Sequence, residues 1–189
     1  TRYHLVQDLV RAKQRFLNAL FLKFSSFAQD KPVGRTFGAT ALAFTVETEC
    51  IEVLAATPIE ELVERVARYS RGRIGDPEAV AAAVQKAARS SYRLPKALAD
   101  PVNLELATHL RLIRSLEEQI ETLSRPIEEL LATIPNTLGS VKGLGPVYVA
   151  GIVAEIADIW RFRNHNAVAK YAGLAWSRHQ SGKFESEET

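Results

Sequence analysis

Residues 102–134 read VNLELATHLRLIRSLEEQIETLSRPIEELLATI, and they carry the clearest periodicity in the chain. Their large apolar residues step mostly by alternating four and three positions, which is typical of a narrow apolar seam along one face of a long helix. Pro126 falls inside this seam and predicts a kink or a split of the helix there. The seam consists of Leu106, Leu110, Ile113, Leu116, Ile120, Leu123, Ile127, Leu130 and Ile134.

A seam this narrow has to be buried against another helix. Either the N-terminal helix of the same chain packs along it or a second chain does. We expect both, an antiparallel helix pair within the chain and a dimer or higher homo-oligomer that makes the long helix coiled-coil-like. A plain bundle within one chain is the alternative.

The composition favours an all-α fold. Of the 189 residues, 47% are hydrophobic, and Ala, Leu, Glu and Arg dominate over aromatic and β-branched residues. No apolar stretch reaches the ~20 residues that a membrane span needs, so we expect no membrane partner. The chain has no Met and no signal peptide, which we interpret as a fragment of a longer protein. A lone Cys50, expected to be a buried structural thiol, excludes a disulfide framework and indicates a reducing cytoplasm.

The N-terminal half is predicted to form several helices separated by Pro and Gly. A first helix over residues 3–28 carries Arg11 and Arg15 one turn apart on one face, as candidate DNA-binding residues. A second helix is predicted over 37–56. A third begins with Thr57 as N-cap and Pro58 at its first position and runs to about Tyr69.

Residues 70–80, SRGRIGDPEAV, predict a turn between two helices. Gly72 and Gly75 end one helix, and Asp76 caps the next, which runs to about Ser91. Arg71 and Arg73 lie in this turn and are candidate contacts to a DNA backbone, although an ordinary helical hairpin is the bland alternative. Pro95 and Pro101 predict a short linker before the seam.

Charge is segregated along the chain although the net charge is only +2. Basic residues dominate 1–35 and 65–96, whereas acidic residues dominate 36–64 and 100–135. Basic lobes of this kind can meet a polyanion, and a solvated helix face is the alternative for any one of them.

Residues 141–151, VKGLGPVYVAG, resemble a helix-hairpin-helix motif. Leu138 and Val141 are predicted to end a short apolar helix, Gly143-Leu144-Gly145 to form a tight turn, and Pro146 to begin the next helix, in which Ala150 faces its partner.

Such a turn exposes amide groups at a helix N-terminus, where they and the helix dipole make an anion site. We expect Leu144 to anchor the turn in the core. Lys142, Gly143 and Gly145 are therefore candidate DNA-backbone contacts, which would position DNA without reading its sequence. A glycine hairpin without a ligand is the alternative.

Residues 140–182, SVKGLGPVYVAGIVAEIADIWRFRNHNAVAKYAGLAWSRHQSG, resemble the C-terminal domain of the insertion sequence 110/116/902 transposases. That family has an Ile-Pro-Gly-Ile-Gly-Pro-like turn, then Ala-Glu-Ile-Gly-Asp-Ile, Arg-Phe, Tyr-Ala-Gly-Leu and Ser-Gly. Residues 1–135 resemble the family's basic first helix and helical insert. The matching positions in 140–182 are Gly143, Gly145, Pro146, Ala154, Glu155, Ile156, Asp158, Ile159, Phe162, Tyr171, Ala172, Gly173, Leu174, Ser181 and Gly182.

The resemblance implies part of a DNA transposase or recombinase. In this family an N-terminal domain binds Mg²⁺ through four carboxylates, a structured non-coding RNA guides some members, and the active assembly is an oligomer. Ser181 takes the place of the family's catalytic serine, and an unremarkable loop serine is the alternative. Trp176 and Gln180 depart from the family pattern around it. The four-carboxylate domain is not recognised in this sequence, so we expect no cofactor, no metal site and no activity of this fragment alone.

The sequence therefore predicts two domains. Residues 1–135 form a helical and coiled-coil domain with a basic insert at about 36–99, and residues 136–189 form the truncated start of the C-terminal transposase domain. The expected role is dimerisation and binding of DNA, or of a guide RNA, through the backbone. The alternatives are a non-catalytic helix-hairpin-helix accessory of DNA repair and a purely structural coiled-coil protein.

Overall fold

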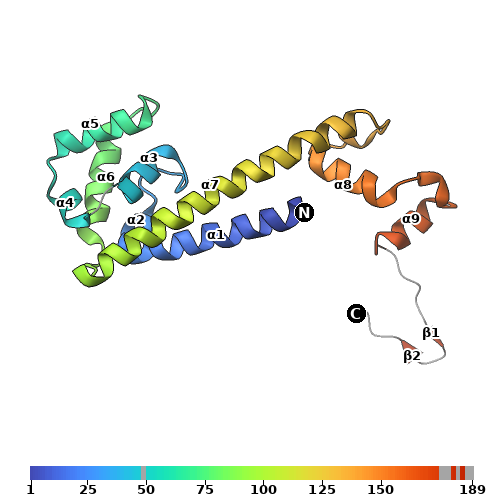
Figure 1. Ribbon diagram of the computed structural model, residues 1–189, viewed down its shortest axis with the longest axis horizontal. Helices are drawn as coiled ribbons and strands as arrows, with labels where there is room; N and C mark the ends of the chain where they lie inside the picture. The colour runs from blue at the N-terminus through green and yellow to red at the C-terminus, as the bar shows by residue number, and fades with distance from the viewer. Residues whose placement is uncertain (48–49, 175–179, 182–183, 186–189) are drawn as a thin grey trace. The chain divides into compact units, whose positions relative to one another are not determined.

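The computed structural model of this chain is helical along most of its length (Figure 1). It describes residues 1–47, 50–174, 180–181 and 184–185. The all-α prediction is confirmed, because the strands among these residues are two-residue pieces. The elements are α1 (Arg2–Lys23), α2 (Ser25–Asp30), α3 (Ala39–Leu42), the π-helix η1 (Ala43–Glu47), α4 (Ile51–Ala56), α5 (Ile59–Ser70), α6 (Pro77–Ser90), α7 (Lys96–Ala132), the 3₁₀ turn η2 (Leu138–Ser140), α8 (Pro146–Ile156), the 3₁₀ turn η3 (Ile159–Arg161), α9 (His165–Tyr171), β1 (Gln180–Ser181) and β2 (Phe184–Glu185).

The chain divides into two compact units. Unit 1 comprises Thr1–Ser124 and unit 2 comprises Arg125–Thr189, so α7 contributes residues to both. Each unit is described by itself. The predicted domain ranges of 1–135 and 136–189 stay a prediction.

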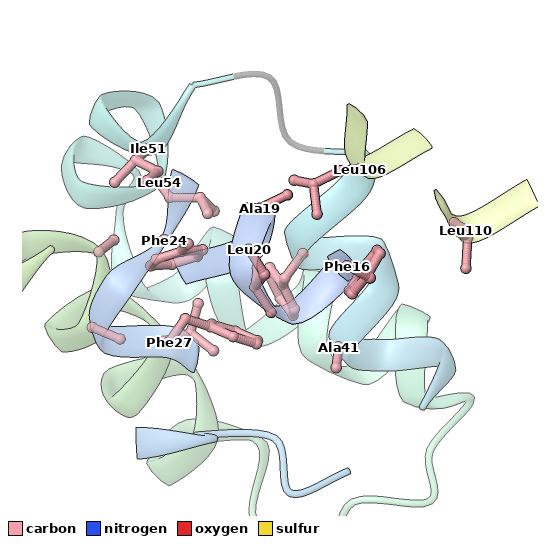
Figure 2. Close-up of a cluster of buried hydrophobic side chains, with 14 of the residues drawn as sticks. Phe16, Ala19, Leu20, Phe24, Phe27, Ala41, Ile51, Leu54, Leu106 and Leu110 are labelled. Carbon is pink, nitrogen blue, oxygen red and sulfur yellow. The ribbon is translucent and has the colours of Figure 1, made fainter. Parts of the chain in front are cut away.

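The core of unit 1 is built from the apolar faces of its helices. Phe16, Phe24 and Phe27 are fully buried, and the rings of Phe24 and Phe27 lie 4.7 Å apart. Figure 2 shows α1 and α2 at the centre, with Ile51 of α4 on one side and Leu106 of α7 on the other. Burying each such side chain contributes about 1.5–3 kcal/mol, so these residues hold the short helices onto the long ones.

Helices α1 and α7 run antiparallel within unit 1 (Figure 1). Lys13 Nζ lies 2.7 Å from Glu117 Oε1, and Arg2 Nε donates a 2.8 Å hydrogen bond to Ser124 Oγ. The first four seam residues, Leu106 to Leu116, are buried. No helix within the described residues combines the length and the apolar character that a bilayer crossing requires.

Two of the predicted helices are interrupted. The helix predicted over 3–28 breaks at the fully buried Phe24, whose φ of −145° and ψ of 69° separate α1 from α2. The helix predicted over 37–56 is instead α3, η1 and α4. In η1, the buried hydroxyl of Thr45 donates to the carbonyl of Ala41 at 2.8 Å. Tertiary burial of these residues overrides the continuous helical pattern.

The predicted N-cap role of Thr57 is wrong. Its hydroxyl donates back to the carbonyl of Val53 at 2.7 Å, so Thr57 closes α4 instead of opening α5. Pro58 is the N-cap of α5 and supplies no side-chain hydrogen bond. Thr57 is buried, and its carbonyl accepts from Gln85 Nε2 of α6 at 2.7 Å, which fixes its orientation.

The turn between α5 and α6 forms as predicted, and a Schellman motif at the end of α5 is an additional feature. Asp76 caps α6 by accepting from the amide of Ala79 at 2.9 Å. At the end of α5, Gly72 N–H donates to Ala67 and Arg71 N–H to Arg68, which is a Schellman motif. Arg71 itself takes the left-handed position, with φ of 54°.

The linker predicted between Pro95 and Pro101 is wrong, and of the two outcomes predicted at Pro126 the split does not occur, whereas the kink stays a prediction. Pro95 precedes α7, but Pro101 lies within its first turns, so the linker predicted between them is helix. Pro101 is the sixth residue of α7, beyond the first four amides that lack a partner, so the helix includes it at the cost of one backbone hydrogen bond, the one to the carbonyl of Ala97. At Pro126 the helix continues without a split, to Ala132.

Within unit 2, α9 is a short helix with a side-chain cap at its start. Asn164 Oδ1 accepts from the amide of Ala167 at 3.0 Å at the start of α9. Gly173, with φ of 71°, ends it in a second Schellman motif, in which Leu174 N–H donates to Ala169 at 2.8 Å.

Candidate nucleic-acid interface

The glycine turn before α8 has a backbone that requires its first glycine. Leu144 N–H donates to the carbonyl of Val141 at 3.1 Å, which closes a four-residue turn. Gly143 is its third residue and has a φ of 97°, a value that other residues rarely adopt. Lys142 and Gly143 are both exposed, so the turn presents a cation and bare backbone to solvent.

The N-terminus of α8 has no side-chain cap. Gly145 is the N-cap, with φ of −76° and ψ of 162°, and Pro146 follows at the first helical position. The carbonyl of Gly145 accepts from Tyr148 and Val149, which starts the helix. Within the described part of the chain, the amides of Lys142, Gly143 and Gly145 donate to no other backbone group. This arrangement can receive an anion, because amides and the helix dipole face it together.

The predicted anchor Leu144 is half-buried rather than fully buried. It lines an open cavity of about 790 Å³ together with Leu131, Ile134 and Val149, all within unit 2. The apolar helix predicted to end at Leu138 and Val141 is only the 3₁₀ turn η2. Gly139 inside that segment and Pro135 just before it disfavour a longer helix.

A cluster of ring and charge contacts joins α8 to α9, and the sequence did not single it out as a site. The Tyr171 hydroxyl donates to Glu155 Oε1 at 3.1 Å. The Arg161 guanidinium lies over the rings of Phe162 and Tyr171, 4.7 and 4.8 Å from their centroids. The signal was present, because Glu155, Phe162 and Tyr171 are three of the positions that match the family pattern.

The other predicted DNA contacts are not brought together into one site. Arg11 and Arg15 are exposed on α1, and Arg11 pairs with Asp8 at 3.1 Å. Arg71 and Arg73 are exposed in the α5–α6 turn, which Figure 1 shows well separated from α1. Both pairs belong to unit 1, whereas the glycine turn belongs to unit 2.

Ser181 lies in a short hairpin. Its backbone is in β1, where it pairs with Phe184 of β2, and Gln180 pairs with Glu185. Gly182 lies outside the described residues.

The described residues do not fit a magnesium site. Among them, no three His, Cys, Asp or Glu side chains gather closely enough to hold a metal ion. No catalytic step through a metal follows from this part of the chain.

A scan of protein-family models matches the part of the chain that contains the glycine turn, the ring cluster and the Ser181 hairpin. Residues 136–189 match the Transposase IS116/IS110/IS902 family. The resemblance of residues 140–182 is therefore confirmed, whereas that of residues 1–135 stays a prediction, and the match suggests a role in DNA transposition. No curated protein and no solved structure matches the chain significantly. Within the matched transposase segment, α8 and its glycine turn have the geometry best suited to an anion.

Proposed function

We propose that this chain acts in DNA transposition and that the glycine turn before α8 binds the phosphate backbone of DNA. The observation that carries the proposal is the transposase match over 136–189, together with the uncapped N-terminus of α8 inside it. Lys142 adds a charge beside the amides. Contacts of this kind position DNA without selecting a sequence.

We infer that the turn and α8 act as a helix-hairpin-helix element although the helix before the turn is short. The hairpin supplies exposed backbone and α8 supplies the dipole, and neither depends on the length of the first helix. Gly145 supports this role, because a Cβ added there would meet no atom within 4 Å. The space in front of the helix is therefore open to a ligand.

We also propose self-association through the end of the seam, as a dimer or higher oligomer. Leu130 is 65% exposed, and Ile134 is also exposed, although both continue the apolar spacing of α7. Apolar side chains at seam spacing that their own chain leaves uncovered favour a partner helix.

Ser181 is proposed as the nucleophile that the transposase family places at this position. A serine hydroxyl needs activation by a base or a metal before it attacks a phosphodiester. We propose that the Mg²⁺ carboxylates of the family's catalytic domain provide that activation, and that a guide RNA is a further partner.

The first test is fluorescence anisotropy of the chain with duplex DNA and with structured RNA over a salt series. We expect affinity that falls with salt and is lost in Lys142→Glu, because the variant places a negative charge beside the phosphate. Lys31→Glu, at an exposed lysine in unit 1, makes the same charge change and controls for it. Binding that survives Lys142→Glu would remove the turn from the interface, and absent binding at low salt would favour a structural protein.

A second pair of variants tests the backbone itself. Gly145→Ala puts a methyl group in front of α8, where the phosphate would lie, and Gly145 has an ordinary φ of −76°. Gly139→Ala adds the same methyl in equally open space outside the glycine turn. We expect Gly145→Ala alone to weaken DNA binding about tenfold, the size of one lost charge-assisted contact. Equal affinities in the two variants would contradict a backbone phosphate site.

A further inference from the structure

Trp160 is 89% exposed in the 3₁₀ turn between α8 and α9. An indole is one of the largest apolar side chains, and leaving it in water forgoes the stabilisation that burial would bring. Ile159 beside it is also exposed. An indole exposed in this way is available to a partner that can stack on it.

Contacts within unit 2 hold the backbone that carries Trp160 on both sides. The Asp158 carboxylate accepts from the Trp160 amide at 2.9 Å, and Asp158 caps the turn. On the other side, Arg161 lies over the rings of Phe162 and Tyr171, and Tyr171 bonds Glu155 of α8. The indole therefore projects from a turn that hydrogen bonds and ring contacts hold in place.

The surroundings of Trp160 are basic and available to an anion. Arg161, Arg163 and Lys170 are exposed in the same segment. The two carboxylates of the segment, Asp158 and Glu155, each already accept a hydrogen bond from the chain itself. An apolar protein partner would remove water from these cations without giving them a counter-charge, which is costly. A nucleic-acid strand would pair them with phosphates.

We propose that Trp160 is a stacking platform for an unpaired base of DNA, with Arg163 and Lys170 holding the flanking phosphates. Stacking needs the free face of a base, which a duplex hides and a single strand offers. The proposal rests on the proposed function, since both place DNA on unit 2. It adds a distinct claim, that this turn recognises single-stranded DNA through a base.

The test measures binding of the whole chain to oligothymidine of about 16 nucleotides, labelled at one end. An abasic oligonucleotide of equal length keeps the phosphates and lacks the bases, and a duplex and an RNA of matching sequence complete the set. The variants are Trp160→Ala and Trp160→Phe. Tyr148→Ala, at a residue 73% exposed on α8, is the matched control.

We expect Trp160→Ala to weaken oligothymidine binding about tenfold and to leave abasic and duplex binding unchanged. Trp160→Phe should recover part of the loss, and Tyr148→Ala should not reproduce it. Melting temperatures should stay equal, because Trp160 is 89% exposed and its removal costs little burial. In a Trp176→Phe background, oligothymidine should also quench the fluorescence of Trp160 through stacking.

Three results would overturn the proposal. Equal loss on abasic and base-containing strands would mean that the turn acts through phosphates only, and the proposed function would stand. Loss confined to RNA would refute a DNA platform. Loss of self-association in Trp160→Ala, with DNA binding intact, would assign the indole to a protein contact. Absence of any nucleic-acid binding by the unmodified chain would instead refute the proposed function.

Discussion

At the scale of single residues, Ala157 has the least favourable backbone of the described non-glycine residues with positive φ. Its φ of 52° and ψ of −115° lie in a region that suits glycine, and it ends α8. The family pattern Ala-Glu-Ile-Gly-Asp-Ile has glycine at this position. The alanine therefore carries strain at the point where the chain turns from α8 toward Trp160.

Ala157→Gly should stabilise unit 2 by about 1 kcal/mol, because relief of strain outweighs the extra freedom of glycine in the unfolded chain. Ala154→Gly, at an exposed position within α8, should destabilise it by about 0.5–1 kcal/mol. Urea unfolding followed by circular dichroism checks both variants, because unit 2 contains the helices α8 and α9. A loss of stability in Ala157→Gly would refute the strain.

Glu52 is a second residue whose contribution can be measured, through the pH dependence of stability. Its pKa is lowered below the ordinary 4.5 by a hydrogen bond from the Cys50 thiol, by its own backbone and by Arg93, against a small opposing effect of burial. Cys50 is thus half-buried and hydrogen-bonded, not the buried thiol expected.

Because the folded pKa of Glu52 is depressed, its stabilising effect is present above pH 4.5 and is lost as pH falls through the folded value. Glu52→Gln should therefore lower stability near neutral pH and flatten its decline in acid. Urea midpoints on either side of pH 4.5 measure this, with Glu60→Gln of α5 as control. An unchanged acid slope in Glu52→Gln would show that this carboxylate does not contribute.

At the scale of elements, α7 has a buried face and an exposed face within unit 1. This difference is why its apolar spacing could be read from the sequence. Seam residues at spacings of three and four meet the core of unit 1 up to Leu116, as the periodicity predicted. The pattern could not show that the later seam residues Leu130 and Ile134 are exposed, because spacing reports a face and not what covers it.

Leu106→Ala should destabilise unit 1 by about 2–5 kcal/mol, because Leu106 is fully buried and its removal leaves a cavity. Leu104→Ala makes the same chemical change two residues away, where the side chain is 64% exposed, and should be nearly neutral. Urea unfolding followed by circular dichroism compares them. Similar losses in both variants would mean that the burial in α7 is misassigned.

At the scale of the whole molecule, the candidate DNA-contact residues lie in different units, which bears on the proposed binding of DNA. Arg71 and Arg73 sit in unit 1 and the glycine turn in unit 2, so a footprint that includes both would use two units. Salt dependence separates these contributions, since each phosphate contact releases counterions.

Arg71→Ala combined with Arg73→Ala should weaken DNA binding and reduce the slope of log affinity against log salt by about 2 if that turn contacts phosphates. Arg111→Ala with Arg114→Ala removes the same charge from exposed positions in the acidic segment of unit 1 and is the control. An unchanged slope in the arginine pair would remove the α5–α6 turn from the DNA footprint.

The sequence by itself determined the helical class, the Asp76 cap, the glycine turn and the transposase resemblance. Each of these depends on local chemistry, namely helical periodicity, capping side chains and a position that needs positive φ. Only the tertiary structure decided that Phe24 breaks the first helix, that Thr57 closes α4, and that Trp160 is exposed to solvent on a capped turn. Those outcomes depend on which distant side chains bury a residue, and the spacing of residues along one chain does not contain that information.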